Sequence, residues 1–319
     1  MTSTNRSSDA PLVLSIVVPC YNEGSSVGQL VQRIRDEFAA IPIEFDFVLI
    51  DDGSSDNTLG TMRSMVDTDV RFVSLSRNFG KEAAMFAGLQ RARGSVVVLM
   101  DGDLQHPPEV VKQLVDEHIT TGVDQVIAVR NRTGDPVVRR VLSGAYFRIV
   151  NRLVDVPLTD GAGDFRLLSR RAVDAILQLT ERTRFSKGLF AWIGYSSSVV
   201  TYKNQVRLAG KSGWTMRSLV DYGLDGALSF NTRPLRSMVT AGLVASSLFF
   251  AYLSWLVIDA LIVGIITPGY ITLVAIVVFL GGLQLICIGI VGEYVGRIYL
   301  EAKARPHYLV GEESPPAHE

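Results

Sequence analysis

The amino-terminal two thirds of the chain alternate between short apolar runs and amphipathic stretches. Near-continuous apolar runs, typical of strands buried on both faces, occupy residues 12–18, 45–50, 72–75, 96–100 and 125–129. Helical spacing of apolar side chains follows at 25–39, from Asn57 onwards and at 81–91. This alternation predicts an α/β fold with a mainly parallel sheet and helices on both faces. In such folds ligands bind beyond the carboxyl ends of the strands.

The pattern changes near residue 232, where two long apolar stretches begin. Residues 237–258 and 270–291 contain no charged side chain. Each is long enough to cross the ~30 Å hydrocarbon core of a bilayer as a helix. We therefore expect a two-helix transmembrane hairpin, and the alternative is a pair of buried helices in a soluble protein.

Basic residues lie before and after this hairpin but not in the loop that connects its two helices. Arg233 and Arg236 precede it and Arg297, Lys303 and Arg305 follow it, whereas the connecting loop has no lysine or arginine. Because such residues favour the cytoplasmic side, we expect both termini in the cytoplasm and a multi-pass protein of the inner (plasma) membrane.

The expected organisation has five parts. In chain order they are a disordered lead (1–10), a cytoplasmic globular domain (11–215), a juxtamembrane amphipathic segment (216–236), two transmembrane helices within 237–292 and a cytoplasmic tail (293–319). The amphipathic segment lies along the membrane surface or packs on the globular domain.

Composition excludes several classes of protein. Hydrophobic residues make up 48% and charged residues 20% of the 319 residues, so the chain is not disordered. The net charge of -1 argues against a nucleic-acid partner, which usually requires a basic excess. Cys20 and Cys287 are the only cysteines, which excludes a disulfide framework and a cysteine-built zinc site.

Polar segments follow the first two predicted strands. Pro19, Tyr21 and Glu23 follow the first, and a tyrosine there could stack on a base. Asp51 and Asp52 follow the second, and adjacent carboxylates are costly unless they serve a ligand, a metal or a helix cap. The chain contains neither GxGxxG after the first strand nor GxxxxGK[ST], so a dinucleotide-binding fold and a P-loop are not expected.

The segment after the fourth strand carries the candidate metal ligands. Asp101 and Asp103 are two residues apart, which in extended backbone directs both carboxylates to one side. Such oxygen ligands suit Mg²⁺ or Mn²⁺, usually completed by substrate phosphates, and Gln105 could add a third oxygen. We expect Gly102 to let a ligand approach the backbone and His106 to be a histidine of a surface loop.

Together these segments resemble glycosyltransferase family 2, whose catalytic domain has the glycosyltransferase A-type (Rossmann-like) fold. The resemblance rests on VVPCYNE (17–23), LIDDGSSD (49–56), SRNFGKEAA (76–84) and MDGDLQHPPE (100–109). Further segments resemble the polyisoprenyl-phosphate branch, which includes bactoprenol glucosyltransferases and dolichol-phosphate mannose synthases. They are GDFRLLSRRAV (163–173), KGLFAWIGY (187–195), RLAGKSGWT (207–215) and GEYVGRIYLEAKARPHYLV (292–310).

The resemblance implies a role for each candidate residue. Pro19, Tyr21, Glu23, Asp52 and Asp101 would hold the nucleotide sugar, with Arg207 and Lys211 closing over its phosphates. Asp101, Asp103 and Gln105 would hold the metal, and Arg130 or Arg132, with Arg139 and Ser143, the acceptor phosphate. Asp164 and Asp103 would be the catalytic carboxylates. The alternative for Asp164 is a structural carboxylate paired with Arg166 or Arg170.

The implied reaction is metal-dependent transfer of a hexose from a nucleotide sugar to polyprenyl phosphate, with inversion. We expect the donor to be UDP-glucose, the transferred sugar to be glucose and the acceptor to be undecaprenyl phosphate. GDP-mannose-dependent mannosyl transfer is the alternative, followed by a processive polysaccharide synthase and a non-enzymatic membrane partner. A homo-oligomer is compatible with the sequence.

Overall fold

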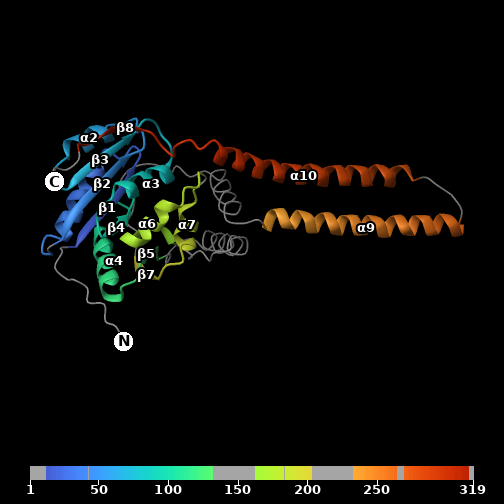
Figure 1. Ribbon diagram of the computed structural model, residues 1–319, viewed down its shortest axis with the longest axis horizontal. Coiled ribbons are helices and arrows are strands. Elements are labelled where there is room, and N and C mark those ends of the chain that lie inside the picture. Colours follow the sequence, from blue (N-terminus) through green and yellow to red (C-terminus); the bar gives the residue numbers. More distant parts are fainter. Residues whose placement is uncertain are drawn as a thin grey trace.

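The computed structural model describes residues 12–41, 43–131, 162–182, 184–202, 233–263 and 269–315. One eight-stranded sheet, in the order β7-β5-β6-β4-β1-β2-β3-β8, forms the centre of the globular domain (Figure 1). In chain order the strands are β1 (Val13–Cys20), β2 (Glu44–Asp51), β3 (Val70–Leu75), β4 (Val96–Leu99), β5 (Gln125–Arg130), β6 (Ala162–Ser169), β7 (Ser197–Tyr202) and β8 (Val310–Glu313).

Helices cover both faces of this sheet, as the sequence pattern predicts. They are α1 (Val27–Glu37), α2 (Thr58–Ser64), α3 (Lys81–Arg91), α4 (Pro108–Thr121), α6 (Arg170–Gln178) and α7 (Ser186–Trp192). Alternate residues of β1 enter different cores. Leu14, Ile16 and Val18 pack with α1 and α4, whereas Val17 packs with α3. Helix α3 lies close to β1, since a Cβ on Gly88 would come within 2.2 Å of Val17 Cγ1.

The sheet is mixed, which corrects the expectation of a mainly parallel one. Strands β1, β2, β3 and β4 pair in parallel, and so do β5 and β7. Strand β6 runs antiparallel between β4 and β5, and β8 runs antiparallel to β3. The five predicted strands and the helix at 81–91 are confirmed, whereas β6, β7 and β8 were not predicted.

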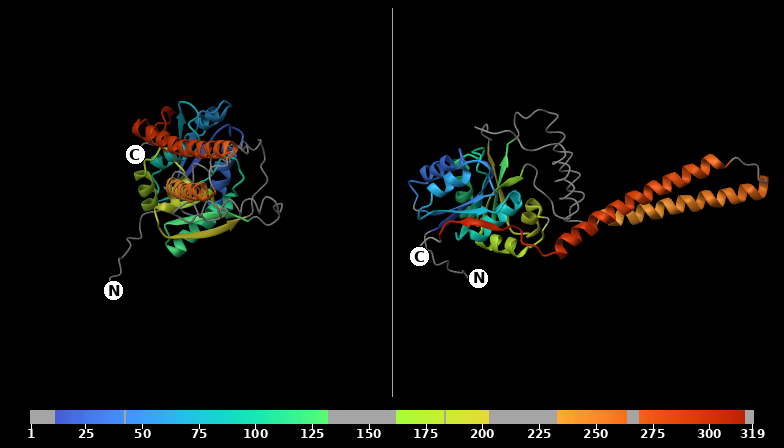
Figure 2. Two further views of the ribbon diagram at one scale, coloured as in Figure 1. Left: turned by 90° about the vertical axis from the view of Figure 1, so that its right-hand side faces the viewer. Right: turned by 90° about the horizontal axis from the view of Figure 1, so that it is seen from above.

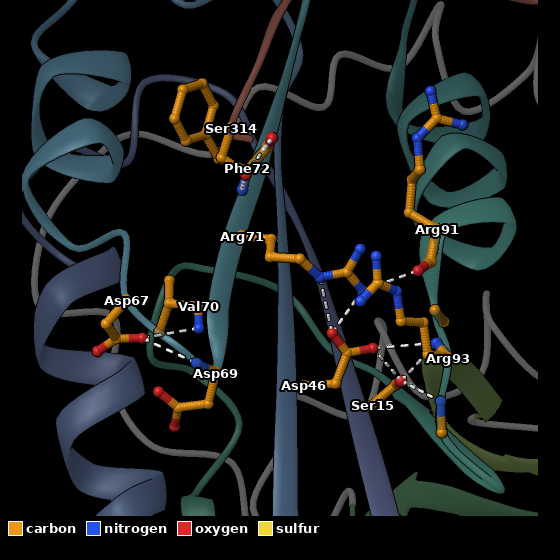
Figure 3. A network of polar contacts seen from close by, with 12 residues as sticks. Ser15, Asp46, Asp67, Asp69, Val70, Arg71, Phe72, Arg91, Arg93 and Ser314 are labelled. Carbon is orange, nitrogen blue, oxygen red and sulfur yellow. Dashed lines mark hydrogen bonds and ion pairs between the residues drawn. The ribbon is translucent and has the colours of Figure 1, made fainter. Parts of the chain in front are cut away.

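A buried polar cluster joins the strands near their amino ends. The Ser15 hydroxyl donates to Asp46 Oδ2 over 2.6 Å, and Arg71 Nε donates to Asp46 Oδ1 over 2.9 Å (Figure 3). The backbone N–H of Arg93 also donates to Asp46. The Asp46 carboxylate therefore has charge-assisted partners from several strands, as a buried charge requires.

Two long helices extend from the globular domain. Helix α9 (Arg233–Val263) and helix α10 (Tyr270–Ala302) lie side by side, as both views in Figure 2 and Figure 1 show. Large apolar side chains are exposed along both, including Leu248 and Leu261 on α9 and Leu285 on α10. Within the described residues, Phe279–Ala302 meets the length and hydropathy expected of a membrane span.

Candidate functional site

The carboxyl ends of the parallel strands gather the predicted site residues at one edge of the sheet. Because β6 is antiparallel to β4, its first residues lie at this same edge. In this antiparallel pair Leu99 lies opposite Arg166. Asp101 comes two residues after Leu99, and Asp164 comes two residues before Arg166, so the two aspartates lie on the same side of the paired strands. Strand topology therefore brings together two carboxylates that are distant in the sequence.

A lysine from helix α3 lies between these carboxylates. Lys81 Nζ is 2.6 Å from Asp101 Oδ1 and 2.7 Å from Asp164 Oδ2. Lys81 is the first residue of α3, whose N-cap is Gly80. The ammonium group neutralises part of a charge cluster that would otherwise be self-repelling.

The ion pairs decide the ionisation of this cluster. Burial acts to raise the pKa of Asp101 and of Asp164, but the ammonium group of Lys81 reverses this effect and lowers both pKa values. Burial acts to lower the pKa of Lys81, but the two carboxylates raise it above its usual range. All three groups are therefore charged at neutral pH.

The two carboxylate oxygens of Asp164 have different surroundings. Its Oδ2 contacts Lys81, whereas its buried Oδ1 has no hydrogen-bond partner among the residues that the structure describes. Neither predicted arginine partner pairs with it: Arg166 donates to the carbonyl of Gly163, and Arg170 donates to Asp174 and to the carbonyl of Ala92. The described ion-pair partner of Asp164 is Lys81, and the role of Asp164 in the reaction stays a prediction.

His106 is not the surface histidine that the sequence led us to expect. Its side chain is 14% exposed and packs against the rings of Phe165 and Tyr202. His106 Nδ1 lies 2.8 Å from the Tyr202 hydroxyl, and Nε2 faces Asp101 Oδ2 at 3.5 Å. Burial raises the pKa of Tyr202 to about 12, so its hydroxyl stays protonated and can donate to His106.

The aspartates after β2 have structural partners. The backbone N–H of Ser54 and the hydroxyl of Ser74 donate to Asp51, at 3.0 and 2.7 Å. The N–H groups of Phe79 and Gly80 donate to the two oxygens of Asp52, at 2.7 and 3.0 Å. Asp52 therefore holds the turn that leads into α3, the helix that carries Lys81, and its predicted contact with the nucleoside stays a prediction.

The loops after β1 and β2 are joined tightly. Asn22, which has a positive φ of 58°, accepts hydrogen bonds from the N–H groups of Ser55 and Asp56. Gly53 has φ +66° and a Cβ there would come within 2.4 Å of the Arg77 carbonyl carbon, so only glycine fits. Tyr21 is 50% exposed beside this junction, where a planar ligand group could reach it.

Gly102 also allows close packing between two parts of the fold. A Cβ on Gly102 would lie 3.0 Å from Cys20 Sγ, so its small size lets the loop after β4 approach β1. Asp103 accepts a hydrogen bond from the N–H of Gln105 over 3.0 Å, which fixes the turn that carries these two predicted metal ligands.

A third acidic side chain, Glu82, follows Lys81 in the chain and was not among the predicted site residues. Both the N–H and the hydroxyl of Ser186, the first residue of α7, donate to the Glu82 carboxylate. Burial, reinforced by the charge of Asp164, raises the pKa of Glu82 to about 7. Glu82 therefore ties the start of α7 to the start of α3.

Comparisons with known proteins show the family of the chain. The model of "Glycosyl transferase family 2" matches residues 15–177. The glycosyltransferase CsbB of Bacillus subtilis is 46% identical over 306 residues, covering 95% of this chain and 93% of the relative. The chain belongs to glycosyl transferase family 2.

A second curated relative and a solved structure are also similar to this chain. The bactoprenol glucosyl transferase of Shigella phage SfV is 39% identical, covering 94% of this chain and 98% of that protein. The crystal structure of mannosyl-3-phosphoglycerate synthase from Rubrobacter xylanophilus superimposes with a TM-score of 0.49 and 20% identity, covering 71% of this chain and 74% of that one.

The donor set at the end of β4 fits a divalent cation bound together with a phosphate ligand. Asp101 already holds the Lys81 cation, and Asp103 is two residues away. Within the described parts of the chain no three acidic, histidine or cysteine side chains form a cage. Two carboxylates with substrate oxygens in the remaining positions is the usual arrangement for Mg²⁺.

Of the remaining predicted residues, the structure describes Pro19, Glu23 and Arg130. Pro19 lies in β1, and the N–H of Glu23 donates to the Thr58 hydroxyl over 2.9 Å. Arg130 ends β5, and its positive charge acts on Tyr202. The others lie outside the described residues, namely Arg132, Arg139, Ser143, Arg207 and Lys211. Lys81 lies within the family segment 76–84, and its position directly after Gly80, at the start of a predicted helix, is the sequence signal that marks it.

Proposed function

We propose that this family 2 glycosyltransferase transfers glucose from UDP-glucose to undecaprenyl phosphate at the cytoplasmic face of the membrane, with inversion at the anomeric carbon. The observation that carries the proposal is the extent of the match to the phage bactoprenol glucosyl transferase, 94% of this chain and 98% of that one. A match of this extent takes in α9 and α10 together with the globular domain, so the likeness is not confined to a shared sugar-nucleotide fold.

The proposed reaction is a single displacement. An oxygen of the acceptor phosphate attacks the anomeric carbon, the bond from that carbon to the donor diphosphate breaks, and the nucleoside diphosphate leaves with the electron pair. A phosphate monoester has a second pKa of about 6 and is mostly dianionic at neutral pH. The nucleophile therefore needs no strong base, and Asp164 would orient the reacting groups.

The residues at the carboxyl ends of the strands would have different roles. Tyr21, beside the joined loops, would stack on the donor base, and Asp101 and Asp103 would hold a divalent cation. That cation, when bound, supplies positive charge to the leaving diphosphate. Asp164 Oδ1, which lacks a partner among the described residues, would face the sugar or the acceptor.

Arginines would recognise the acceptor. A guanidinium group matches phosphate oxygens through paired hydrogen bonds. Arg130 or Arg132, with Arg139 and Ser143, would hold the polyprenyl phosphate, and Arg207 and Lys211 would cover the donor phosphates. We assign these roles from the family resemblance.

The proposed membrane arrangement places α9 and α10 across the bilayer, with the globular domain in the cytoplasm. Its support is the apolar surface of both helices, the hydropathy of 279–302 and the position of the basic flanks in the sequence. The globular part, residues 11–215, would then work beside the surface where the lipid phosphate lies, with 216–236 along that surface.

The experiment is a donor panel. Full-length protein in detergent is given undecaprenyl phosphate, Mg²⁺ or Mn²⁺ and radiolabelled UDP-glucose or GDP-mannose, and the organic phase is analysed for labelled lipid. We expect a glucosyl lipid from UDP-glucose and none with a chelator. Labelling from GDP-mannose alone would replace the sugar, and no labelled lipid from any donor would contradict the reaction.

A further inference from the structure

The chain returns to the globular domain after α10. Residues 303–315, here called the tail strap, run past α3 and end in β8 at the edge of the sheet, as the red trace in Figure 1 shows. The chain therefore joins α10 to the globular domain through this segment.

Backbone pairing fixes the end of the tail strap. Strand β8 pairs antiparallel with β3, and the N–H of Ser76 donates to the carbonyl of Leu309 over 2.9 Å. Ser314 donates its N–H to the carbonyl of Phe72 over 3.0 Å and accepts the N–H of Phe72 on its hydroxyl over 3.1 Å (Figure 3). These bonds make β8 an integral strand of the sheet.

Side chains fix the middle of the tail strap to α3. The ring of His307 lies 4.8 Å from that of Phe86, edge to face, and the Tyr308 hydroxyl donates to Gln90 over 2.5 Å. Arg91, at the end of α3, pairs with Glu313 at 3.1 Å. The tail strap therefore contacts the second half of α3, between Phe86 and Arg91.

Helix α3 connects this contact to the candidate site. Its first residue, Lys81, pairs with Asp101 and Asp164, and its later turns hold the tail strap. The end of α10 also touches the domain directly, because Glu301 accepts the N–H of Arg182 over 2.7 Å. One short rigid helix thus contacts both the site and the segment leaving α10.

We infer that the tail strap is a positioning element, which fixes the site at a set distance and orientation from the end of α10 and so from an acceptor phosphate in the bilayer. This inference rests on the proposed function. It requires that the tail strap matter for an acceptor in a membrane and not for the donor or for an acceptor dissolved in water.

The test loosens the connection and leaves β8 in place. An insertion of about six Gly and Ser residues after Ala304, an exposed position, adds a flexible link of about 13 Å on average. The matched control carries the same insertion after Gly122, an exposed turn between α4 and β5, at the opposite end of the parallel strands. Full-length proteins are reconstituted in vesicles containing undecaprenyl phosphate, or given isopentenyl phosphate in solution, with UDP-glucose as donor.

We expect the insertion after Ala304 to lower transfer to the vesicle-bound acceptor about tenfold or more, because fixed geometry and effective concentration are lost. Transfer to isopentenyl phosphate and the affinity for UDP should stay within about twofold of the control. Equal loss with both acceptors would mean that the tail strap is only structural, and no loss would mean that it does not position the site. Either result overturns the inference.

A failure of the proposed function would look different. The protein without any insertion would then transfer to neither acceptor, and the inference would fall with it. Replacement of Ser314 by proline removes the N–H that bonds to Phe72 and provides a second variant, with Ser314→Ala as its control. We expect the proline variant to lose vesicle transfer preferentially, and a parallel loss of UDP binding would overturn the inference.

Discussion

Aspartates follow β2 and β4, on either side of β1, and the structure surrounds them differently. Each oxygen of Asp51 and Asp52 accepts a hydrogen bond from a backbone N–H or a serine hydroxyl. Asp101 instead faces a lysine and, across the sheet edge, the Asp164 carboxylate.

This difference separates a scaffold from a site. The hydrogen bonds to Asp51 and Asp52 are complete within the fold and hold the start of α3 against β2. Lys81 pairs with both carboxylates of the site, but its side chain is 41% exposed, and Asp164 Oδ1 has no hydrogen-bond partner among the described residues. A strand-end aspartate is therefore a candidate for chemistry when its contacts within the fold are exposed or incomplete.

The largest effect should come from Asp164. Asp164→Asn keeps the shape of the side chain but removes the charge beside Lys81, and we expect transfer to fall about 10²-fold or more. Stability should change little. The measurement is the initial rate of lipid labelling, with Asp174→Asn, an exposed carboxylate of α6, as control. Rates within a few-fold of each other would remove Asp164 from the reaction.

Lys81 should give the next largest effect. In Lys81→Met, Asp101 and Asp164 face each other without a cation, so their pKa values rise. We expect the acid limb of the pH–rate profile to move to higher pH by about one unit, with a slower rate at neutral pH. Lys112→Met on α4 is the control. An unchanged acid limb would contradict the charge assignment.

Asp51 should affect stability and not transfer. Asp51 is buried, and in Asp51→Asn an NH₂ group must face one of two donors, Ser54 N–H or the Ser74 hydroxyl. We expect a loss of about 1–3 kcal/mol in unfolding free energy and an unchanged rate per folded molecule. Urea unfolding measures the loss, and Asp36→Asn on the exposed face of α1 serves as control. A normal stability would show that the carboxylate is not needed by the fold.

The smallest effect concerns the pH dependence of stability. Burial raises the pKa of Glu82 to about 7 in the folded protein, so between its unfolded pKa and that value the folded state binds more protons. This group therefore stabilises the fold at low pH and loses that contribution as pH rises through about 7, by roughly 1–3 kcal/mol.

Glu82→Gln should remove this component. Thermal unfolding of the two proteins from about pH 5 to about pH 8 should show a smaller decline for the variant. Parallel curves would contradict the raised pKa of Glu82.

The sequence predicted those helices and strands that are specified by neighbouring residues in the chain. The helix at 81–91 has the predicted bounds because an alanine-rich amphipathic run follows a glycine, and the first five strands are apolar runs between polar loops. Strand β6 was missed because nothing near 162–169 states that it inserts antiparallel between β4 and β5. That pairing depends on residues far away in the chain.

The same distinction applies to the candidate site. Asp101, Asp103 and Asp164 were selected from their segments, but the Lys81 bridge joins residues far apart in sequence and required the sheet topology. The partners of Asp51 and Asp52 and the packing of His106 against Phe165 and Tyr202 also depend on residues far apart in the sequence. Sequence patterns identified the candidate carboxylates. Only the packing shows that Asp51 and Asp52 are hydrogen-bonded within the fold, whereas Asp101 and Asp164 share Lys81.

The most direct test compares Asp101→Asn with Asp51→Asn at equal concentrations of folded protein. The quantity is the initial rate of glucose transfer from UDP-glucose to undecaprenyl phosphate. We predict that Asp101→Asn loses about 10²-fold or more with normal unfolding, whereas Asp51→Asn keeps its rate per folded molecule. Equal rates in the two variants, or full activity of Asp101→Asn, would contradict the assignment of the site to the end of β4.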